Sequence, residues 1–194
     1  MSSRPENGFS AEERRAMLAL ARSTIVGALR NSPARIPGPE PACFSIRRGL
    51  FVTVHVAGKL RGCIGVIEGR ETVRESIIHC AESAAFHDPR FPSLRATEME
   101  ELQIEISILS ELAPISPESI EIGKHGLFVD SGSHRGLLLP QVAVEHGLSS
   151  EQFLQETCRK AGLPRDAWRR AETKLFGFSC EIFHEDGPAE AVAC

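Results

Sequence analysis

The chain of 194 residues has no tyrosine, a single tryptophan and no excess of basic charge. With a formal net charge of −4, it lacks the electrostatic footprint of a protein that binds duplex nucleic acid. One tryptophan also makes an aromatic platform for single strands sparse, although ten phenylalanines leave that possibility open. No stretch approaches the roughly 18 consecutive apolar residues of a membrane-spanning helix, so we expect no span across a bilayer.

The cysteines lack the C-x-x-C spacing of zinc ribbons and thioredoxin-like sites. The six are Cys43, Cys63, Cys80, Cys158, Cys180 and Cys194. Residues 1–9 are short and polar, without the apolar core of a secretory signal. We therefore expect a cytoplasmic protein with reduced cysteines, no metal and no cofactor.

Capping boxes, in which a hydroxyl residue precedes Glu or Gln by three positions, predict where three helices begin. The predicted helices span 10–29, 72–88 and 149–161, with apolar residues at helical spacing in each. Between the first two, the proline-rich segment 31–42 is predicted to be a surface loop. The tail 186–194 is small and polar and is expected to be disordered, which leaves one domain over 8–185.

Alternation of apolar and polar residues predicts the strands. A hairpin is expected over 50–56 and 59–67, joined at Ala57-Gly58. Further predictions are a strand over 102–108, a second hairpin over 126–130 and 135–139, and a last strand over 176–182. Helices packed on mixed or antiparallel sheets make the fold class α+β.

The most informative stretch is 60–65, Leu-Arg-Gly-Cys-Ile-Gly, which places two glycines inside a predicted strand. Because glycine weakens a strand, Gly62 and Gly65 indicate a place where a ligand or another backbone comes close. If the run stays extended, Arg61 and Cys63 share one face about 6.6 Å apart. A guanidinium at that distance favours the thiolate, which makes Cys63 a candidate nucleophile.

The alternative is that Cys63 is a small buried apolar residue, as most free cysteines are. Covalent catalysis by cysteine usually needs a base, and no histidine is adjacent in sequence. The candidates are His55, His79 and His87, if the fold brings one close. A metal site built from Cys63, Cys80 and scattered histidines is a separate hypothesis.

Three further segments carry candidate site residues. Asp88 and Arg90 flank Pro89, followed by Phe91, in a turn that either positions a cation in a pocket or is simply held by an Asp88–Arg90 pair. Glu105, with Ser107, is either a general base with a hydroxyl partner or part of a solvated strand face. Pro140 and Gln141 open a predicted helical turn, where the amide either contacts a ligand or caps the helix.

These motifs together resemble the AMMECR domain, also called system protein A of the AmmeMemoRadiSam set, over nearly the whole chain. The matching segments are 60–65, 88–92, 105–109, 123–127, 139–142 and 160–163. The resemblance implies an α+β fold in two subdomains, with the hexapeptide at or near a cleft between them. It also implies an association with a Memo-like protein and a radical-SAM enzyme, but no established reaction.

Our hypothesis is an enzyme that uses Cys63 in a cleft to modify a small anionic, nucleotide-like or nucleic-acid substrate. Its predicted catalytic residues are Cys63, Arg61 and Glu105. Its predicted substrate-binding residues are Gly62, Gly65, Asp88, Arg90, Phe91, Pro140 and Gln141. The alternative is a non-catalytic binding or adaptor module whose hexapeptide face docks a partner, so whether the chain is an enzyme stays open.

Overall fold

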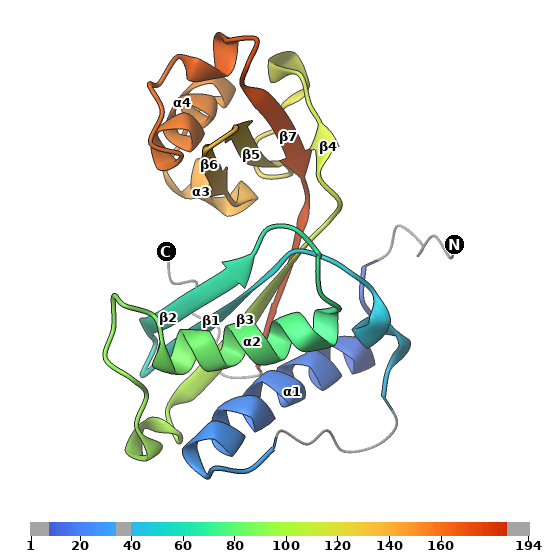
Figure 1. Ribbon diagram of the computed structural model, residues 1–194, viewed down its shortest axis with the longest axis vertical. Coiled ribbons are helices and arrows are strands. Elements are labelled where there is room, and N and C mark those ends of the chain that lie inside the picture. The colour runs from blue at the N-terminus through green and yellow to red at the C-terminus, as the bar shows by residue number, and fades with distance from the viewer. Residues whose placement is uncertain (1–7, 34–39, 186–194) are drawn as a thin grey trace. The chain divides into compact units, whose positions relative to one another are not determined.

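The computed structural model describes residues 8–33 and 40–185 (Figure 1). The described chain divides into two compact units. The first contains residues 8–33, 40–108 and 181–185, and the second contains residues 109–180. The predicted disordered tail, 186–194, and part of the predicted loop, 34–39, lie outside the described residues.

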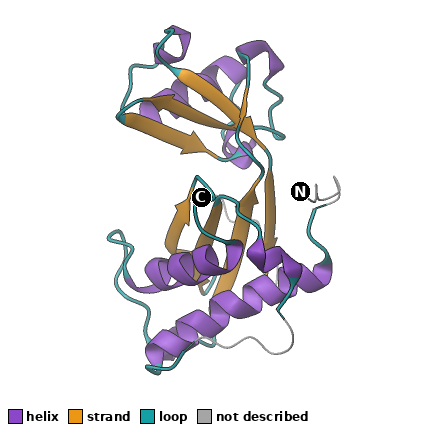
Figure 2. Cartoon of the chain, turned by 45° about the vertical axis from the view of Figure 1, so that its right-hand side comes forward, coloured by secondary structure: helices purple, strands orange, loops and turns teal. Residues whose placement is uncertain are grey.

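The first unit packs two helices on one face of a four-stranded sheet, as Figure 2 shows. The helices are α1 (Ala11–Leu29) and α2 (Val73–Phe86). The strands are β1 (Leu50–Val56), β2 (Lys59–Val66), β3 (Leu102–Leu109) and β8 (Cys180–His184), in the spatial order β2-β1-β3-β8. Both β2 and β3 pair antiparallel with β1, so β1 is an inner strand and β2 lies at the edge.

The core of the first unit lies between this sheet and the two helices. Val52 and Val54 from β1 and Ile104 and Ile106 from β3 have no exposed surface. Each such buried side chain contributes about 1.5–3 kcal/mol relative to an exposed one. Because side chains alternate along a strand, Thr53, between the two valines, lies on the opposite face of the sheet. That opposite face carries the site described below.

The second unit packs α3 (Pro140–Glu145) and α4 (Ser150–Lys160) with a second four-stranded sheet. Its strands are β4 (Ala113–Pro114), β5 (Gly126–Ser131), β6 (His134–Leu138) and β7 (Lys174–Phe178), in the order β4-β7-β5-β6. Phe153 and Leu154 of α4 are buried with Leu127 of β5. The short 3₁₀ turns of the described chain are Ala42–Ser45, Ala96–Glu98, Pro117–Ser119 and Ala167–Arg169.

The α+β class with antiparallel sheets is confirmed. All three predicted capping boxes form, and the helices begin directly after Ser10, Thr72 and Ser149. The predicted last strand, 176–182, is wrong as a single element, because β7 ends at Phe178 and β8 begins at Cys180, and each strand belongs to a different sheet. No described helix is both long and apolar enough to cross a membrane.

Candidate functional site

The hexapeptide lies on β2, in a hairpin whose register contains one irregularity. Ala57 and Gly58 both have positive φ, 50° and 73°, as a type I′ turn requires. Val54 pairs with Gly62, but the next residue of β1, His55, pairs with Leu60. This β-bulge leaves Arg61 without a partner on β1. A bulge locally bends the strand and re-aims side chains, so the strict alternation assumed from the sequence does not hold at Arg61.

Arg61 connects β2 to the loop that follows α2. Its Nε and Nη2 donate to the two carboxylate oxygens of Glu98, at 3.1 and 3.3 Å, and Nη2 also donates to the carbonyl of Ser93 at 3.2 Å. Its Nη1 donates to the carbonyl of Pro92. The side chain is only 15% exposed. The expectation that Arg61 is the guanidinium promoting a Cys63 thiolate is therefore corrected: its charge is used to hold the 92–98 loop.

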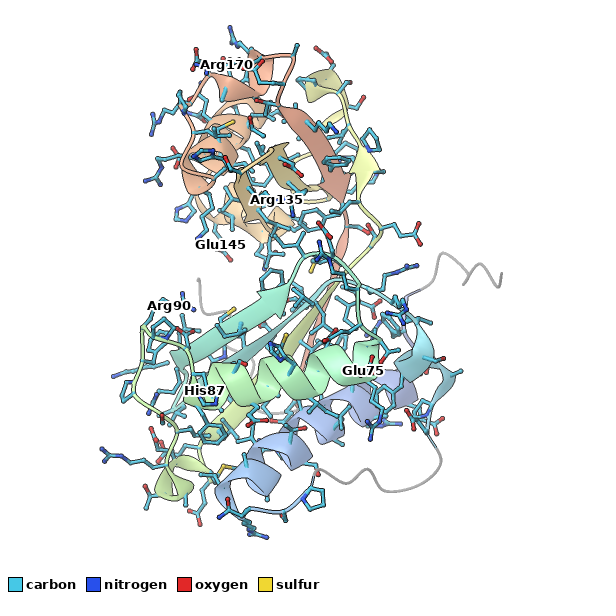
Figure 3. The ribbon with its side chains drawn as sticks, in the orientation of Figure 1. Glu75, His87, Arg90, Arg135, Glu145 and Arg170 are labelled. Carbon is cyan, nitrogen blue, oxygen red and sulfur yellow. The ribbon has the colours of Figure 1, made fainter. Side chains whose placement is uncertain are left out.

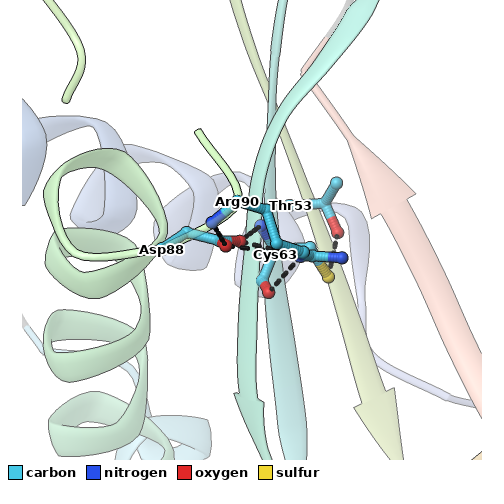
Figure 4. A network of polar contacts seen from close by, with 4 residues as sticks. All are labelled: Thr53, Cys63, Asp88 and Arg90. Carbon is cyan, nitrogen blue, oxygen red and sulfur yellow. Dashed lines mark hydrogen bonds and ion pairs between the residues drawn. The ribbon is translucent and has the colours of Figure 1, made fainter. Parts of the chain in front are cut away.

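Cys63 lies in a row of three paired residues across the sheet. Thr53 on β1 pairs with Cys63 on β2 and with Glu105 on β3. All three therefore point to the face opposite the helices. The hydroxyl of Thr53 donates to Sγ of Cys63 at 3.3 Å (Figure 4). Thr53 is 4% exposed, so this hydroxyl is held in place by its surroundings.

The backbone of Cys63 is held by Asp88 and Arg90, from the turn after α2 (Figure 4). The amide of Cys63 donates to Oδ2 of Asp88 at 3.0 Å, and its carbonyl accepts from Nη2 of Arg90 at 3.1 Å. Arg90 also donates through Nε and Nη2 to both carboxylate oxygens of Asp88, at 3.0 and 2.7 Å. The Asp88 side chain is 2% exposed, whereas that of Arg90 is 57% exposed. The pair thus holds the turn, which was one of the two alternatives, whereas the positioning of a cation in a pocket stays a prediction.

The charges around Cys63 act in opposite directions. Hydrogen bonding from Arg90 holds the pKa of Asp88 far below its ordinary range, so this carboxyl is ionised. Burial raises the pKa of the Cys63 thiol, and the carboxylates of Glu105 and Asp88 raise it further. The Thr53 hydrogen bond and the Arg90 charge lower the same pKa but do not outweigh burial. The resting thiol is therefore protonated at neutral pH.

The space beside the two glycines is taken by the protein itself. A Cβ at Gly62 would lie 1.9 Å from the carbonyl oxygen of Ala84 in α2, and one at Gly65 would lie 2.2 Å from the ring of Phe51. The prediction of a close approach at these glycines is confirmed at Gly62, where the approaching group is a helix backbone. The expectation that Gly62 and Gly65 admit a ligand is corrected, because the backbone of Ala84 fills the space beside Gly62 and the ring of Phe51 fills the space beside Gly65.

Several other predicted residues take defined places. The Arg90 guanidinium lies 5.3 Å from the ring centroid of Phe91. Figure 3 shows His87 at the C-terminal end of α2 and Arg90 in the turn beyond it. His87 and His79 are exposed, whereas His55 is partly buried on β1. The described residues contain no group of three or more His, Cys, Asp or Glu placed to hold a metal ion.

Pro140 and Gln141 belong to the second unit, where they form the first turn of α3. Gln141 is not the N-cap of this helix; Leu139 occupies that position and makes no side-chain capping bond. The amide oxygen of Gln141 is buried and has no hydrogen-bond partner within the described chain. A role for Gln141 in contacting a ligand therefore stays a prediction.

The profile of the AMMECR1 family matches residues 18–183. The chain belongs to the AMMECR1 family. It is 44% identical over 187 residues to a protein of Methanothermobacter thermautotrophicus, covering 92% of this chain and 97% of the relative. A protein of Aquifex aeolicus is 38% identical over 182 residues, covering 90% and 93%. A crystal structure of an uncharacterized protein from Pyrococcus horikoshii, 38% identical, superposes with a TM-score of 0.84 over 93% of this chain and 95% of the other.

In this AMMECR1-family chain, Thr53 is the site residue that sequence reasoning missed. In a hairpin without a bulge, pairing starts with Val56 opposite Lys59 and moves one residue outward on each strand at every step. This register would place Thr53 opposite Gly62. The bulge shifts the register by one residue and sets Thr53 opposite Cys63 instead. Nothing in the local sequence reports that shift.

Proposed function

We propose that the AMMECR1-family chain is a binding module with a site for an anionic group, a carboxylate or a phosphate, formed by Thr53, Cys63, Asp88 and Arg90. These four residues are called the Cys63 site. The observation that carries the proposal is the state of Arg90. Its guanidinium is fixed by the buried carboxylate of Asp88 and by the carbonyl of Cys63, yet its side chain is 57% exposed.

A fixed, exposed guanidinium suits recognition of an oxyanion. Nε and Nη2 of Arg90 already donate to Asp88 and Cys63, so the ligand would be attracted by the positive charge of the guanidinium rather than by a bidentate pair of hydrogen bonds from these atoms. Because Asp88 already holds the guanidinium, little side-chain freedom remains to be lost when a ligand binds. The carboxylate of Asp88 balances the charge but is only 2% exposed, so the group of this pair that a ligand meets is the cation.

The state of the thiol favours binding over catalysis. A nucleophilic cysteine needs thiolate at working pH, and burial raises the pKa of Cys63 instead. In the binding module, Cys63 contacts the ligand as a neutral thiol. Arg61 takes no direct part, because its guanidinium is engaged by Glu98 and the loop carbonyls.

A second candidate is the enzyme, in which Cys63 attacks a small anionic or nucleotide-like substrate. One arrangement favours it: the Thr53 hydroxyl and the Arg90 charge both stabilise a thiolate, and Glu105 lies in the same cross-strand row as the thiol. Such an enzyme would have to remove the thiol proton after the substrate binds. Glu105 is the proposed acceptor of that proton.

Alkylation of Cys63 by two reagents tests the proposal. Iodoacetamide is neutral and iodoacetate is anionic. The rate of Cys63 modification by iodoacetate, divided by the rate with iodoacetamide, therefore reports whether the site attracts anions, and the same ratio for glutathione is the reference. We expect a ratio above that of glutathione, lost in Arg90→Gln and kept in Arg90→Lys. Mass spectrometry of the peptide containing Cys63 separates it from the other cysteines, with Cys63→Ser as the blank.

The pH dependence of the iodoacetamide rate decides between the two candidates. We expect a half-maximal rate above the free-thiol value of about 8.5 for the binding module. A value well below 8.5 would favour the enzyme. An iodoacetate ratio that is the same in wild type and Arg90→Gln would refute the anion site in either case.

As partners we propose the Memo-like and radical-SAM proteins that the family resemblance associates with the chain. Binding of either purified protein to the wild-type chain, weakened at least tenfold by Arg90→Gln, would support a role of the Cys63 site in that contact.

A further inference from the structure

We infer that Thr53 is a positioning residue of the Cys63 site, which orients the Cys63 sulfur and stabilises its thiolate by donating a hydrogen bond to it. The inference rests on the proposed site, because it concerns the same thiol, and the orienting role applies to the neutral thiol of the binding module as well as to the thiolate of the second candidate. Thr53 lies on β1, ten residues before Cys63 in sequence.

The backbone around Thr53 fixes its side chain toward the sulfur. Thr53 and Cys63 are direct cross-strand partners, and the amide and carbonyl of Cys63 bond to Asp88 and Arg90. Those two backbone groups therefore point away from β1, which makes Thr53 and Cys63 a pair without backbone hydrogen bonds between them. Side chains approach most closely in such pairs.

Thr53 is also restricted in its own rotation. It is β-branched, which stiffens χ1, and it is only 4% exposed. Its hydroxyl lies 3.3 Å from Sγ, a normal distance for a bond to sulfur, which is larger than oxygen. A hydroxyl held in this way is available to the sulfur without reorganisation when the thiol loses its proton to solvent.

The ionisable groups near Cys63 come from three other elements. Asp88 and Arg90 belong to the turn after α2, Glu105 belongs to β3, and Cys80 belongs to α2. Arg90 lowers the pKa of the thiol, and Glu105 and Asp88 raise it. Of the two influences that lower this pKa, the Thr53 hydrogen bond is the larger, ahead of the Arg90 charge. Removing the Thr53 hydroxyl should therefore raise the pKa of the Cys63 thiol measurably, even with the charges of Arg90, Glu105 and Asp88 unchanged.

The test compares three substitutions of Thr53 in the full-length chain. Thr53→Val keeps the shape and the β-branch but removes the donor, and Thr53→Ser keeps the donor. We expect the pH profile of iodoacetamide modification at Cys63 to move up by about one pKa unit in Thr53→Val, which is about tenfold slower modification at neutral pH. Thr53→Ser should restore the wild-type profile. Thr53→Ala removes the donor without adding a methyl group and serves if the valine variant does not fold.

Two outcomes would overturn the inference. One is a profile in Thr53→Val or Thr53→Ala within about 0.3 units of wild type, since a bond to a charged acceptor should exceed that. The other is an equal shift in the valine and serine variants, which would assign the effect to packing. The anion site is tested separately, by the iodoacetate-to-iodoacetamide rate ratio in Arg90→Gln, in which Thr53 is intact. Failure of the Thr53 role is thus distinguishable from failure of the anion site.

Discussion

Replacing Asp88 by Asn tests whether the buried carboxylate holds the Cys63 site together. The two side chains have nearly the same shape, so the substitution removes charge and acceptor capacity with little change in packing. The carboxylate of Asp88 accepts four hydrogen bonds, one from the amide of Cys63 and three from Arg90. An asparagine has one acceptor oxygen, and its amino group would face donors.

The expected loss of stability depends on which of the donors that lose the Asp88 carboxylate can form hydrogen bonds with solvent instead. Arg90 is 57% exposed, so its guanidinium can turn to solvent, and the full cost of a broken buried ion pair does not apply. The amide of Cys63 has no such freedom, and an orphaned buried donor costs about 1–3 kcal/mol. With one weakened charge-assisted bond added, we expect Asp88→Asn to lower the free energy of unfolding by about 2–3 kcal/mol.

The pH dependence of that loss has a definite sign. The pKa of Asp88 is depressed in the folded chain, so its contribution is fully present above the unfolded-state value of about 3.9 and declines as the pH falls below it. Urea unfolding followed by circular dichroism should therefore show a constant difference between wild type and Asp88→Asn from pH 5 to 8, which narrows below about pH 4. A difference under about 0.5 kcal/mol at pH 7, or one that grows on acidification, would refute this account.

Three further substitutions are predicted, all measurable by urea unfolding. Gly62→Ala should cost about 3 kcal/mol or more, because its Cβ would meet the backbone of Ala84 at 1.9 Å and α2 would have to move; a cost below 1 kcal/mol would contradict the packing. Ser76→Ala should stabilise by about 1 kcal/mol, because the buried hydroxyl of Ser76 has no hydrogen-bond partner in the part of the chain that the structure describes; destabilisation would show a hidden partner. Arg61→Met should lower stability by about 2 kcal/mol yet leave the alkylation profile of Cys63 unchanged, and a shifted profile would restore Arg61 to the site.

Local signals predicted most of the secondary structure. Ser10, Thr72 and Ser149 each form the capping box that their sequence indicated, because a capping box needs only two residues three positions apart. The split at Ser179 could not be predicted in this way. Residues 176–182 alternate as one strand would, and only their pairing partners, which are distant in sequence, divide them between two sheets.

The site was predicted only in part, because its residues are visible locally in the sequence but the contacts between them join distant positions. Cys63 and the Asp88–Arg90 turn were each visible in the sequence, but the bond between the amide of Cys63 and Asp88 joins residues 25 positions apart. The bulge at Arg61 depends on the register of a hairpin, and it altered both the place of Arg61 and the cross-strand partner of Cys63. It left Arg61, whose guanidinium donates to Glu98, without a partner on β1, and it brought Thr53 opposite Cys63.

The place of β2 in the sheet gives the Asp88–Arg90 pair one more consequence. An outermost strand ordinarily leaves its backbone open to pairing with another chain, which is a route to aggregation. At Cys63 the carboxylate accepts and the guanidinium donates the two bonds that a neighbouring strand would make. The pair therefore blocks the edge of the sheet at Cys63, and a strand of another chain can pair there only after displacing Asp88 and Arg90.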